Sequence, residues 1–297
     1  MLRDGSTTSG SGEPSPKTTR SGRAPSSEPH LPRQRSASDG PATESSLHSA
    51  EVEVGPFRVS DTATHELVDK VVSLSLEERT RPAFAFALHV GGLNARRERD
   101  FVTAMRAADV VYADGGSVVW LARLAGAHRV ARAPTTDIGW GILQEFRERT
   151  GRLPRVALVG GPEGLTARAG VVLEAAGAAD VVLTDHGYHK DWSQPLAELR
   201  AAAPDMTVIG LGAPYEMVWC QQHRDELPNG LVLTCGGWFS HIVGDERRAP
   251  RILRRSGLEW IARMAQSPKR LGPRYARGVG ATAALTISTL VHRPSPD

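Results

Sequence analysis

The fold of this 297-residue chain is decided by residues 108–120, which read Ala-Asp-Val-Val-Tyr-Ala-Asp-Gly-Gly-Ser-Val-Val-Trp. An apolar run, Val110 to Ala113, predicts a short buried strand. Asp114 and two glycines end this run. The apolar segment from Val118 to Leu124 then predicts a helix, with Ser117 placed to cap it. The stretch is therefore a strand, a glycine turn and a helix.

A turn of this kind lies at the carboxyl end of a strand, where open α/β sheets bind their ligands. The glycines let a bulky anion approach the backbone amides at the start of the helix. The carboxylate of Asp114 is expected at the mouth of that site. This stretch alone leaves two interpretations open, a functional carboxylate and an ordinary Asp-Gly turn.

The same alternation of strand, glycine turn and helix continues along the chain. Further strands are predicted at residues 83–90, 156–159, 181–184, 207–211 and 231–234. Further helices are predicted at residues 61–74, 94–108, 138–150, 165–176, 195–203 and 215–226. Repeated units of this kind indicate an α/β fold with a mostly parallel sheet and helices on both faces. The glycine-bearing turns after four of the strands are expected to gather along one edge of the sheet.

Composition divides the chain into three parts. Residues 1–51 are predicted to be a disordered tail, because 28 of the first 50 residues are Ser, Thr, Pro or Gly, and such a segment buries too little apolar surface to fold. Residues 52–246 are the predicted α/β domain. Residues 247–297 are a predicted basic helical appendage, with a helix at 252–264 and a short basic element at 268–275.

The appendage is basic, since residues 245–297 hold 11 Lys and Arg against 4 Asp and Glu. It is expected to attract an anionic partner, which by charge alone is nucleic acid, a phosphorylated substrate or a membrane surface. It has little apolar material of its own. We therefore expect it to lie on the α/β domain, on a neighbouring subunit or on a membrane.

Cysteine usage and hydropathy limit the class of protein. The two cysteines, Cys220 and Cys235, lie in apolar surroundings and form no Cys-x-x-Cys pair. This excludes a disulfide scaffold and a zinc site built on thiolates, and it fits a reducing cytoplasm. No apolar run reaches the roughly 18 residues of a membrane-spanning helix, and the N-terminus lacks the apolar core of a secretory signal. The expected location is the cytoplasm, with or without contact to a membrane.

Nine short motifs follow one another along the chain. In order they are Ala108-Asp109 to Val119-Trp120; Arg129-Val130 with Thr136-Asp137; Val159-Gly160-Gly161; His186-Gly187-Tyr188; Gly210-Leu211-Gly212-Ala213-Pro214 with Trp219; Gly236-Gly237 with Phe239; Arg248-Ala249-Pro250; Gly257-Leu258-Glu259-Trp260; and Pro268, Arg270 and Arg274-Tyr275. Through these motifs the chain, from about Phe86 to Tyr275, resembles the WecG/TagA/CpsF family of glycosyltransferases, family 26.

The resemblance implies a fold, a reaction and partners. The fold is a Rossmann-like sheet with a C-terminal appendage that completes the active site. The reaction moves an N-acetylmannosamine-type sugar, or its uronic acid, from a UDP donor to a polyprenyl-diphosphate-linked sugar on the inner face of the cytoplasmic membrane, in cell-surface polysaccharide synthesis. It inverts the anomeric centre and requires no metal and no cofactor. No nucleic acid partner is implied, and a homo-oligomer is left open.

Single-displacement glycosyl transfer needs a base for the acceptor hydroxyl and positive charge for the departing diphosphate. Asp114 matches the catalytic aspartate of the family and is the predicted base. No Asp-x-Asp pair of the metal-dependent transferases stands at a convincing strand end. Arg263, Arg270 and Arg274 are therefore predicted to neutralise the diphosphate through bidentate contacts. The alternative for these arginines is a solvated basic face.

The other predicted site residues bind the donor, and the glycines among them do so through backbone amides. They are His89, Gly115, Arg129, Asp137, Gly160, Gly161, His186, Gly187, Tyr188, Gly210, Gly212, Pro214, Glu216, Gly236 and Gly237. Purely structural glycines, and a surface ion pair for Arg129 and Asp137, are the alternatives. Asp185, His186 and His189 also permit a metal site. A local cluster without a distant further ligand favours instead a turn that contacts the nucleotide.

The chain departs from the family pattern in three motifs. Where the family has Thr-x-Asn, it reads Ala87-Leu88-His89, so a donor-contacting Thr is missing and His89 stands in for the Asn. Glu216 replaces a neutral amide, and Ser240 replaces an aspartate. All of them lie where the donor is expected to be read. The departures therefore leave the identity of the sugar open more than the type of reaction.

Two alternatives to a glycosyltransferase remain at this point. A catalytically degenerate relative that binds nucleotide or lipid is suggested by the three departures. A nicotinamide-dependent oxidoreductase is the other. It is disfavoured because Gly160-Gly161-x-x-Gly164 lacks the G-x-G-x-x-G spacing, and no Asp or Glu is clearly placed for the ribose.

Overall fold

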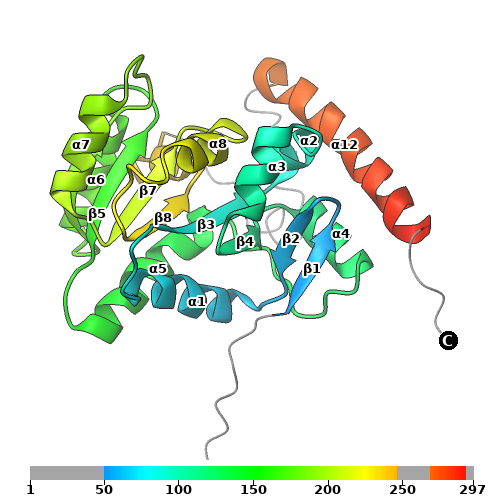
Figure 1. Ribbon diagram of the computed structural model, residues 1–297, viewed down its shortest axis with the longest axis horizontal. Helices are drawn as coiled ribbons and strands as arrows, with labels where there is room; N and C mark the ends of the chain where they lie inside the picture. Colours follow the sequence, from blue (N-terminus) through cyan, green and yellow to red (C-terminus); the bar gives the residue numbers. More distant parts are fainter. Residues whose placement is uncertain (1–49, 246–267, 292–297) are drawn as a thin grey trace, which may run out of the picture. The chain divides into compact units, whose positions relative to one another are not determined.

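The computed structural model of the protein describes residues 50–245 and 268–291. Its centre is a six-stranded sheet in which every neighbouring pair of strands is parallel. From one edge to the other (Figure 1) the strands are β4 (Val110–Ala113), β3 (Ala83–Leu88), β8 (Leu231–Thr234), β7 (Met206–Gly210), β5 (Arg155–Gly160) and β6 (Asp180–Asp185). The predicted α/β class and parallel sheet are confirmed.

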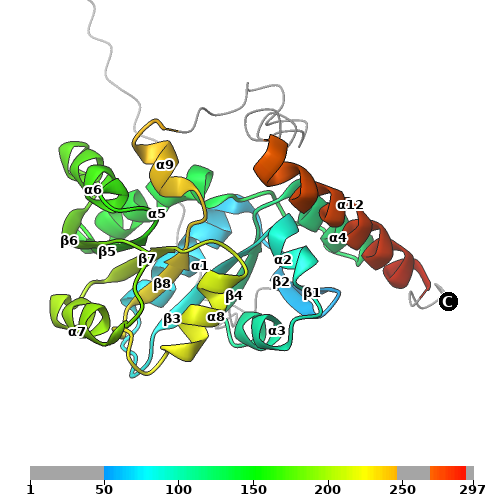
Figure 2. The ribbon, with the colours of Figure 1, turned by 90° about the horizontal axis from the view of Figure 1, so that it is seen from above.

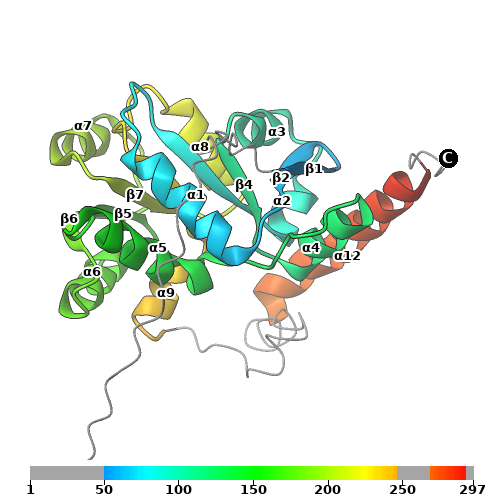
Figure 3. The ribbon, with the colours of Figure 1, turned by 90° about the horizontal axis from the view of Figure 1, so that it is seen from below.

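Helices cover both faces of the sheet. The face seen from above (Figure 2) is packed by α2 (Val90–Asn94), α3 (Arg99–Arg106), α4 (Gly116–Leu124), α7 (Ser193–Ala202) and α8 (Tyr215–Gln222). The opposite face (Figure 3) is packed by α1 (Thr64–Leu76), α5 (Thr135–Thr150), α6 (Leu165–Ala175) and α9 (Trp238–Ile242). A sheet covered on both faces explains why its strands read as apolar runs rather than as alternating patterns.

Strand β3 shows how one sequence serves both layers. Phe84, Phe86 and Leu88 pack into the core with α2, α3 and α8, whereas Ala83, Ala85 and Ala87 face α1 and α5. Successive side chains of a strand point to opposite faces, so the large residues fill one layer and the small ones let helices approach on the other.

Two elements lie outside the central sheet. An antiparallel hairpin, β1 (Glu51–Val54) and β2 (Phe57–Ser60), places Phe57 in the core, where its ring meets Phe101 edge-on with centroids 5.6 Å apart. The C-terminal helix α12 (Pro268–Val291) lies along α2 and α4. None of the helices that the structure describes has the length and apolar character needed to cross a bilayer.

Three sequence predictions need correction. The predicted helix 94–108 is two helices, α2 and α3, because the His89 ring accepts the Gly91 N–H and starts a helix before residue 94. Ser117 does not cap α4, which begins earlier, at Gly116, with Gly115 at the N-cap and no side-chain cap. The short element predicted at 268–275 is the first part of α12, which continues through Gly278 and Gly280 to Val291 and packs against α2.

The predicted domain boundaries stay predictions. Most of the predicted tail, residues 1–49, and residues 247–267 of the predicted appendage lie outside the described residues. So does the helix predicted at 252–264. At the other boundary Glu51, the last residue of the predicted tail, belongs to β1.

Close packing of two strand ends requires a glycine at position 160. Gly160 has φ +133°, and a Cβ there would overlap the carbonyl oxygen of Gly210 on β7. Gly126, after α4, also has a positive φ, +106°, but open space around its Cβ position. Alanine at either position would strain the backbone, but only alanine at position 160 would also overlap a neighbour, so comparing the two substitutions measures the cost of the overlap.

We expect Gly160→Ala to lower the free energy of unfolding by about 1–3 kcal/mol more than Gly126→Ala, the typical cost of overpacking a core. Urea unfolding of the two variants beside the wild type measures this difference. Equal losses would show that the end of β7 moves aside without cost.

Candidate active site

The parallel sheet carries the ends of all six strands to one edge. In spatial order the residues at or just beyond these ends include Asp114, His89, Gly236, Gly212, Gly161 and His186. Neighbouring strands are about 4.8 Å apart, so about 24 Å separate the first of these positions from the last. The predicted gathering of turns along one edge is confirmed, and Asp114 and His186 lie at its opposite ends.

Helix α12 delivers Arg274 to this edge. The Asn94 side chain of α2 donates a hydrogen bond to the Arg274 carbonyl, with an Nδ2–O distance of 2.9 Å. One helical turn further, Gly278 lies against Val90 so closely that a Cβ would overlap Cγ2 of that valine. Leu285, two turns on, is buried beside Gly55 of the β1–β2 turn. The helix is therefore fixed along its length.

The guanidinium of Arg274 lies against the imidazole of His89. Its Nη2 atom is 3.2 Å from His89 Nδ1 and 3.4 Å from Nε2. The same Nδ1 accepts the Gly91 N–H at 2.9 Å, which fixes the ring at the start of α2. Two residues 185 positions apart thus meet beside the end of β3. The prediction that Arg274 belongs to the site gains a geometric basis, and its role stays a prediction.

Glu216, in the first turn of α8, is a buried carboxyl group at the same edge, with 1% of its surface exposed. Burial raises its pKa from the usual 4.5 to about 7. The Gly212 N–H, which donates to Oε2 at 2.9 Å, and the charge of Arg274 oppose this rise in pKa, whereas the charge of Asp114 adds to it. The charges of Asp114, just after β4, and of Arg274, on α12, therefore both act on Glu216.

A hydroxyl network lies under the edge. The Tyr112 hydroxyl is 2.7 Å from Thr135 Oγ1, and both hydroxyls lie within hydrogen-bond distance of the Thr234 carbonyl. Burial raises the pKa of Tyr112 well above its usual value, so the phenol stays neutral. The network joins the ends of β4 and β8 to the start of α5. Sequence reasoning missed it, because a tyrosine inside an apolar strand gives no signal of its partners.

Asp61 fixes the loop beside Asp114. Its carboxylate accepts the N–H groups of His128, Arg129 and Val130 at 2.9, 2.7 and 2.6 Å. Burial alone would raise the pKa of Asp61, but these three donors outweigh burial and lower it. The loop continues to Ala133, whose N–H donates to the Ala113 carbonyl at 2.8 Å. Sequence reasoning read Asp61 only as a helix start.

Arg129 lies in this loop and Asp137 in the first turn of α5, and each has an ion pair. Arg129 pairs with Glu66, and the Asp137 carboxylate is 3.3 Å from Arg132 Nη2. The two predicted residues therefore pair with others rather than with each other. Their predicted contact with the donor stays a prediction.

Several glycine amides at the edge already have acceptors. The Gly161 N–H donates to the Gly210 carbonyl at 3.1 Å, and the Gly187 N–H donates to the Gly161 carbonyl at 3.0 Å. The Gly212 N–H donates to Glu216. Within the described part of the chain, no such acceptor is found for the amides of Gly236 and Gly237. The Gly161 and Gly187 amides thus join the ends of β5, β6 and β7, and the Gly212 amide holds the turn before α8. The amides of Gly236 and Gly237 are the better candidates for binding an anion.

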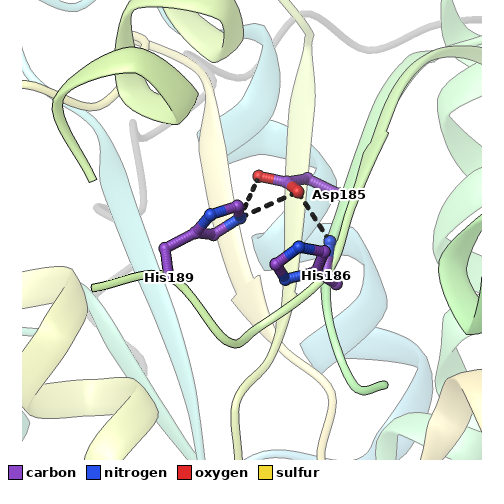
Figure 4. A group of neighbouring side chains, drawn as sticks. All are labelled: Asp185, His186 and His189. Atoms are coloured by element: carbon purple, nitrogen blue, oxygen red, sulfur yellow. Dashed lines mark hydrogen bonds and ion pairs between the residues drawn. The ribbon is translucent and has the colours of Figure 1, made fainter. Parts of the chain in front are cut away.

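Asp185, His186 and His189 form a tight group after β6 (Figure 4), with potential ligand atoms within 4.8 Å of one another. His189 Nε2 is 2.9 Å from both carboxylate oxygens of Asp185, and the Tyr188 N–H donates to His186 Nδ1 at 3.1 Å. The two imidazoles are stacked, with centroids 4.1 Å apart and planes 14° apart.

This stacking does not suit a metal ion. Imidazole nitrogens bind metals in the plane of the ring, and two parallel rings do not direct both lone pairs to one point. Both rings would have to turn and give up the contacts they make now. The arrangement instead orders the turn that carries Tyr188, a side chain with 75% of its surface exposed.

The comparison with known proteins now identifies the family. The model of the glycosyl transferase WecG/TagA/CpsF family matches residues 52–295. The chain belongs to the WecG/TagA/CpsF family of glycosyltransferases. The match confirms the resemblance and extends it to the β1–β2 hairpin and to the whole of α12.

A curated relative from Bacillus spizizenii is named N-acetylglucosaminyldiphosphoundecaprenol N-acetyl-beta-D-mannosaminyltransferase. The chain is 26% identical to it over 186 residues, which cover 60% of this chain and 69% of the relative. The sequence also predicted that Arg263 and Arg270 neutralise the diphosphate, and this stays a prediction. Arg263 lies outside the described residues, and Arg270 lies near the start of α12.

We expect Gly278→Ala to loosen α12, because its Cβ would overlap Val90. Gly280→Ala is the matched control, since it lies one half-turn away with open space at its Cβ position. Hydrogen exchange of α12 amides is expected to be about tenfold faster in Gly278→Ala than in Gly280→Ala, which corresponds to a packing cost of about 1.4 kcal/mol. Equal exchange rates in the two variants would contradict this docking.

We expect Asp61→Asn to melt about 3–10 °C below the wild type at pH 7, because hydrogen bonds to a charged acceptor are weakened. A carboxyl whose pKa is lowered on folding stabilises the protein above its unfolded value, here 3.8, and loses that effect as pH falls through the folded value. The gap between the two melting curves should therefore close below about pH 4. Asp100→Asn, an exposed change on α3, is the control, and a gap independent of pH would refute the role of the charge.

Proposed function

We propose that this protein moves an N-acetylmannosamine-type sugar, or its uronic acid, from UDP to a polyprenyl-diphosphate-linked sugar, with inversion and without a metal. The observation that carries the proposal is the arrangement at one sheet edge of Asp114 and Arg274 in a chain of this family. A carboxylate and a guanidinium at one edge supply the two functions that the reaction requires, a base and a positive charge.

The proposed reaction is a single displacement at the anomeric carbon. Asp114 takes the proton from the acceptor hydroxyl as its oxygen forms the new bond to that carbon. On the opposite side the bond from the carbon to the diphosphate oxygen breaks, and UDP leaves with both electrons. The configuration at the carbon inverts. The β linkage in the name of the Bacillus spizizenii relative is the product that inversion of an α-linked donor gives.

Arg274 would hold the departing diphosphate. A guanidinium is charged at every working pH and binds phosphate oxygens in a bidentate manner. The contact with His89 and the bond from Asn94 to the Arg274 carbonyl pre-organise its position. Arg263 and Arg270 remain proposed partners in the same task. Positive charge from three arginines would replace the metal ion that other transferases use.

The acceptor carries a lipid, and α12 offers features that support work at a membrane surface. Its outer face exposes Val279, Ile287 and Leu290, with 65%, 63% and 53% of their surfaces accessible. Arg277 is exposed on the same helix. Exposed apolar side chains on one face of a helix that also carries an exposed cation suit an interface with anionic lipids. We therefore propose a peripheral location on the inner face of the cytoplasmic membrane.

We expect Asp114→Asn to lower the rate of transfer by about 10²–10⁴-fold, the usual contribution of a general base, while UDP-sugar binding persists. Transfer from UDP-N-acetylmannosamine to a short-chain lipid-diphosphate acceptor measures the rate, and calorimetry measures binding. Asp100→Asn on α3 serves as the control.

Near-normal transfer by Asp114→Asn would overturn the proposed base. Loss of transfer in chelator would overturn the proposed metal independence. Nucleotide binding by the wild type with no transfer from any UDP-sugar would favour the degenerate relative instead.

A further inference from the structure

Glu216 is the most deeply buried carboxyl group of the described residues, with 1% of its surface exposed. It lies at the start of α8, where the chain turns away from the end of β7. Its Oε2 accepts the Gly212 N–H at 2.9 Å, and the Leu211 N–H is a second donor. The carboxyl group is therefore held in place by the turn itself, at the edge where the donor is proposed to bind.

The groups around Glu216 come from four elements. Tyr112 and Asp114 come from β4 and its end, Cys235 follows β8, Cys220 lies on α8, and Arg274 lies on α12. Burial raises the pKa of Tyr112 and of both cysteine thiols well above their usual values, so these three groups are neutral near pH 7. The charges that act on Glu216 are thus those of Asp114 and Arg274, and they have opposite signs.

These two charges have opposite effects on the protonation of Glu216. Arg274 favours the carboxylate, whereas Asp114 favours the protonated acid. A diphosphate that pairs with Arg274 would neutralise the charge that favours the carboxylate and add further negative charge to a desolvated site. Both changes favour the protonated acid. A ligand that binds the protonated form more tightly must take up a proton when it binds.

We infer that Glu216 is a donor-recognition residue that takes up a proton when the diphosphate of the donor binds and neutralises the charge of Arg274. The inference rests on the proposed function, since it assumes that Arg274 meets a diphosphate. It assigns to Glu216 a role that a neutral amide at this position does not perform.

The burial of Glu216 sets the pH range over which donor affinity should change. Because burial raises the pKa of Glu216 to about 7, both the protonated acid and the carboxylate are accessible near neutral pH. Donor affinity should therefore fall as pH rises through this range, since the carboxylate must be protonated when the donor binds.

The test is isothermal titration of UDP-N-acetylmannosamine, without acceptor, in buffers of different ionisation enthalpy. The diphosphate of this donor does not titrate near pH 7, so any proton comes from the protein. We expect proton uptake on donor binding near pH 7, and this uptake should increase toward one proton per donor as pH rises above the pKa of free Glu216. Glu216→Gln, which keeps the shape and removes the titration, should lose this uptake. Glu174→Gln, exposed on α6, should retain it.

Equal proton uptake in the wild type and in Glu216→Gln would overturn the inference while leaving the proposed function intact. Absence of donor binding to the wild type would overturn both. The melting temperature against pH gives a second readout without ligand. A carboxyl whose pKa is raised on folding loses its stabilising effect as pH rises from about 4.5 toward 7. The wild type should therefore fall relative to Glu216→Gln over that range, and parallel curves would also overturn the inference.

Discussion

The contact between α12 and α2 is the interaction on which the candidate site depends. Gly278 meets Val90 with no space for a side chain, and Asn94 holds the Arg274 carbonyl. Because α2 begins directly after β3, this contact sets the position of α12 relative to the strand ends. Close helix packing of this kind is rigid, since every nearby atom is already in contact. Without it the sheet edge would present a carboxylate but not Arg274.

Burial then makes the charges of the edge act together. Asp114, Glu216 and Arg274 come from three distant parts of the chain, yet the charges of Asp114 and Arg274 both act on Glu216, because that carboxyl group is buried and charges interact more strongly away from water. One of the two carboxyl groups is held near the balance between its charged and neutral forms. The family has a neutral amide at the position of Glu216. The carboxyl group in its place adds a group that can gain or lose a proton in response to the charges of Asp114 and Arg274.

Part of the site could be predicted from the sequence, and part could not. The strand, turn and helix around Asp114 were predictable because apolar runs, glycines and helix starts are local signals. The glycines of β5 and β7 were also evident, but their partners were not. Gly161 donates to Gly210, so its amide joins two strands rather than facing solvent. A sequence shows where a backbone is free to bend, and only the packed structure shows which acceptor its amide meets.

The sequence by itself determined the α/β class, the alternation of the central strands with helices and the family to which the chain belongs, because each of these follows from local patterns and short motifs. The tertiary structure decided which residues share the edge. Asp61 at the loop of Arg129, the Tyr112 hydroxyl under Asp114 and Arg274 against His89 are contacts between positions far apart in the chain. No local pattern encodes such pairs, since they arise only when parallel strands bring their ends together and helices pack across them.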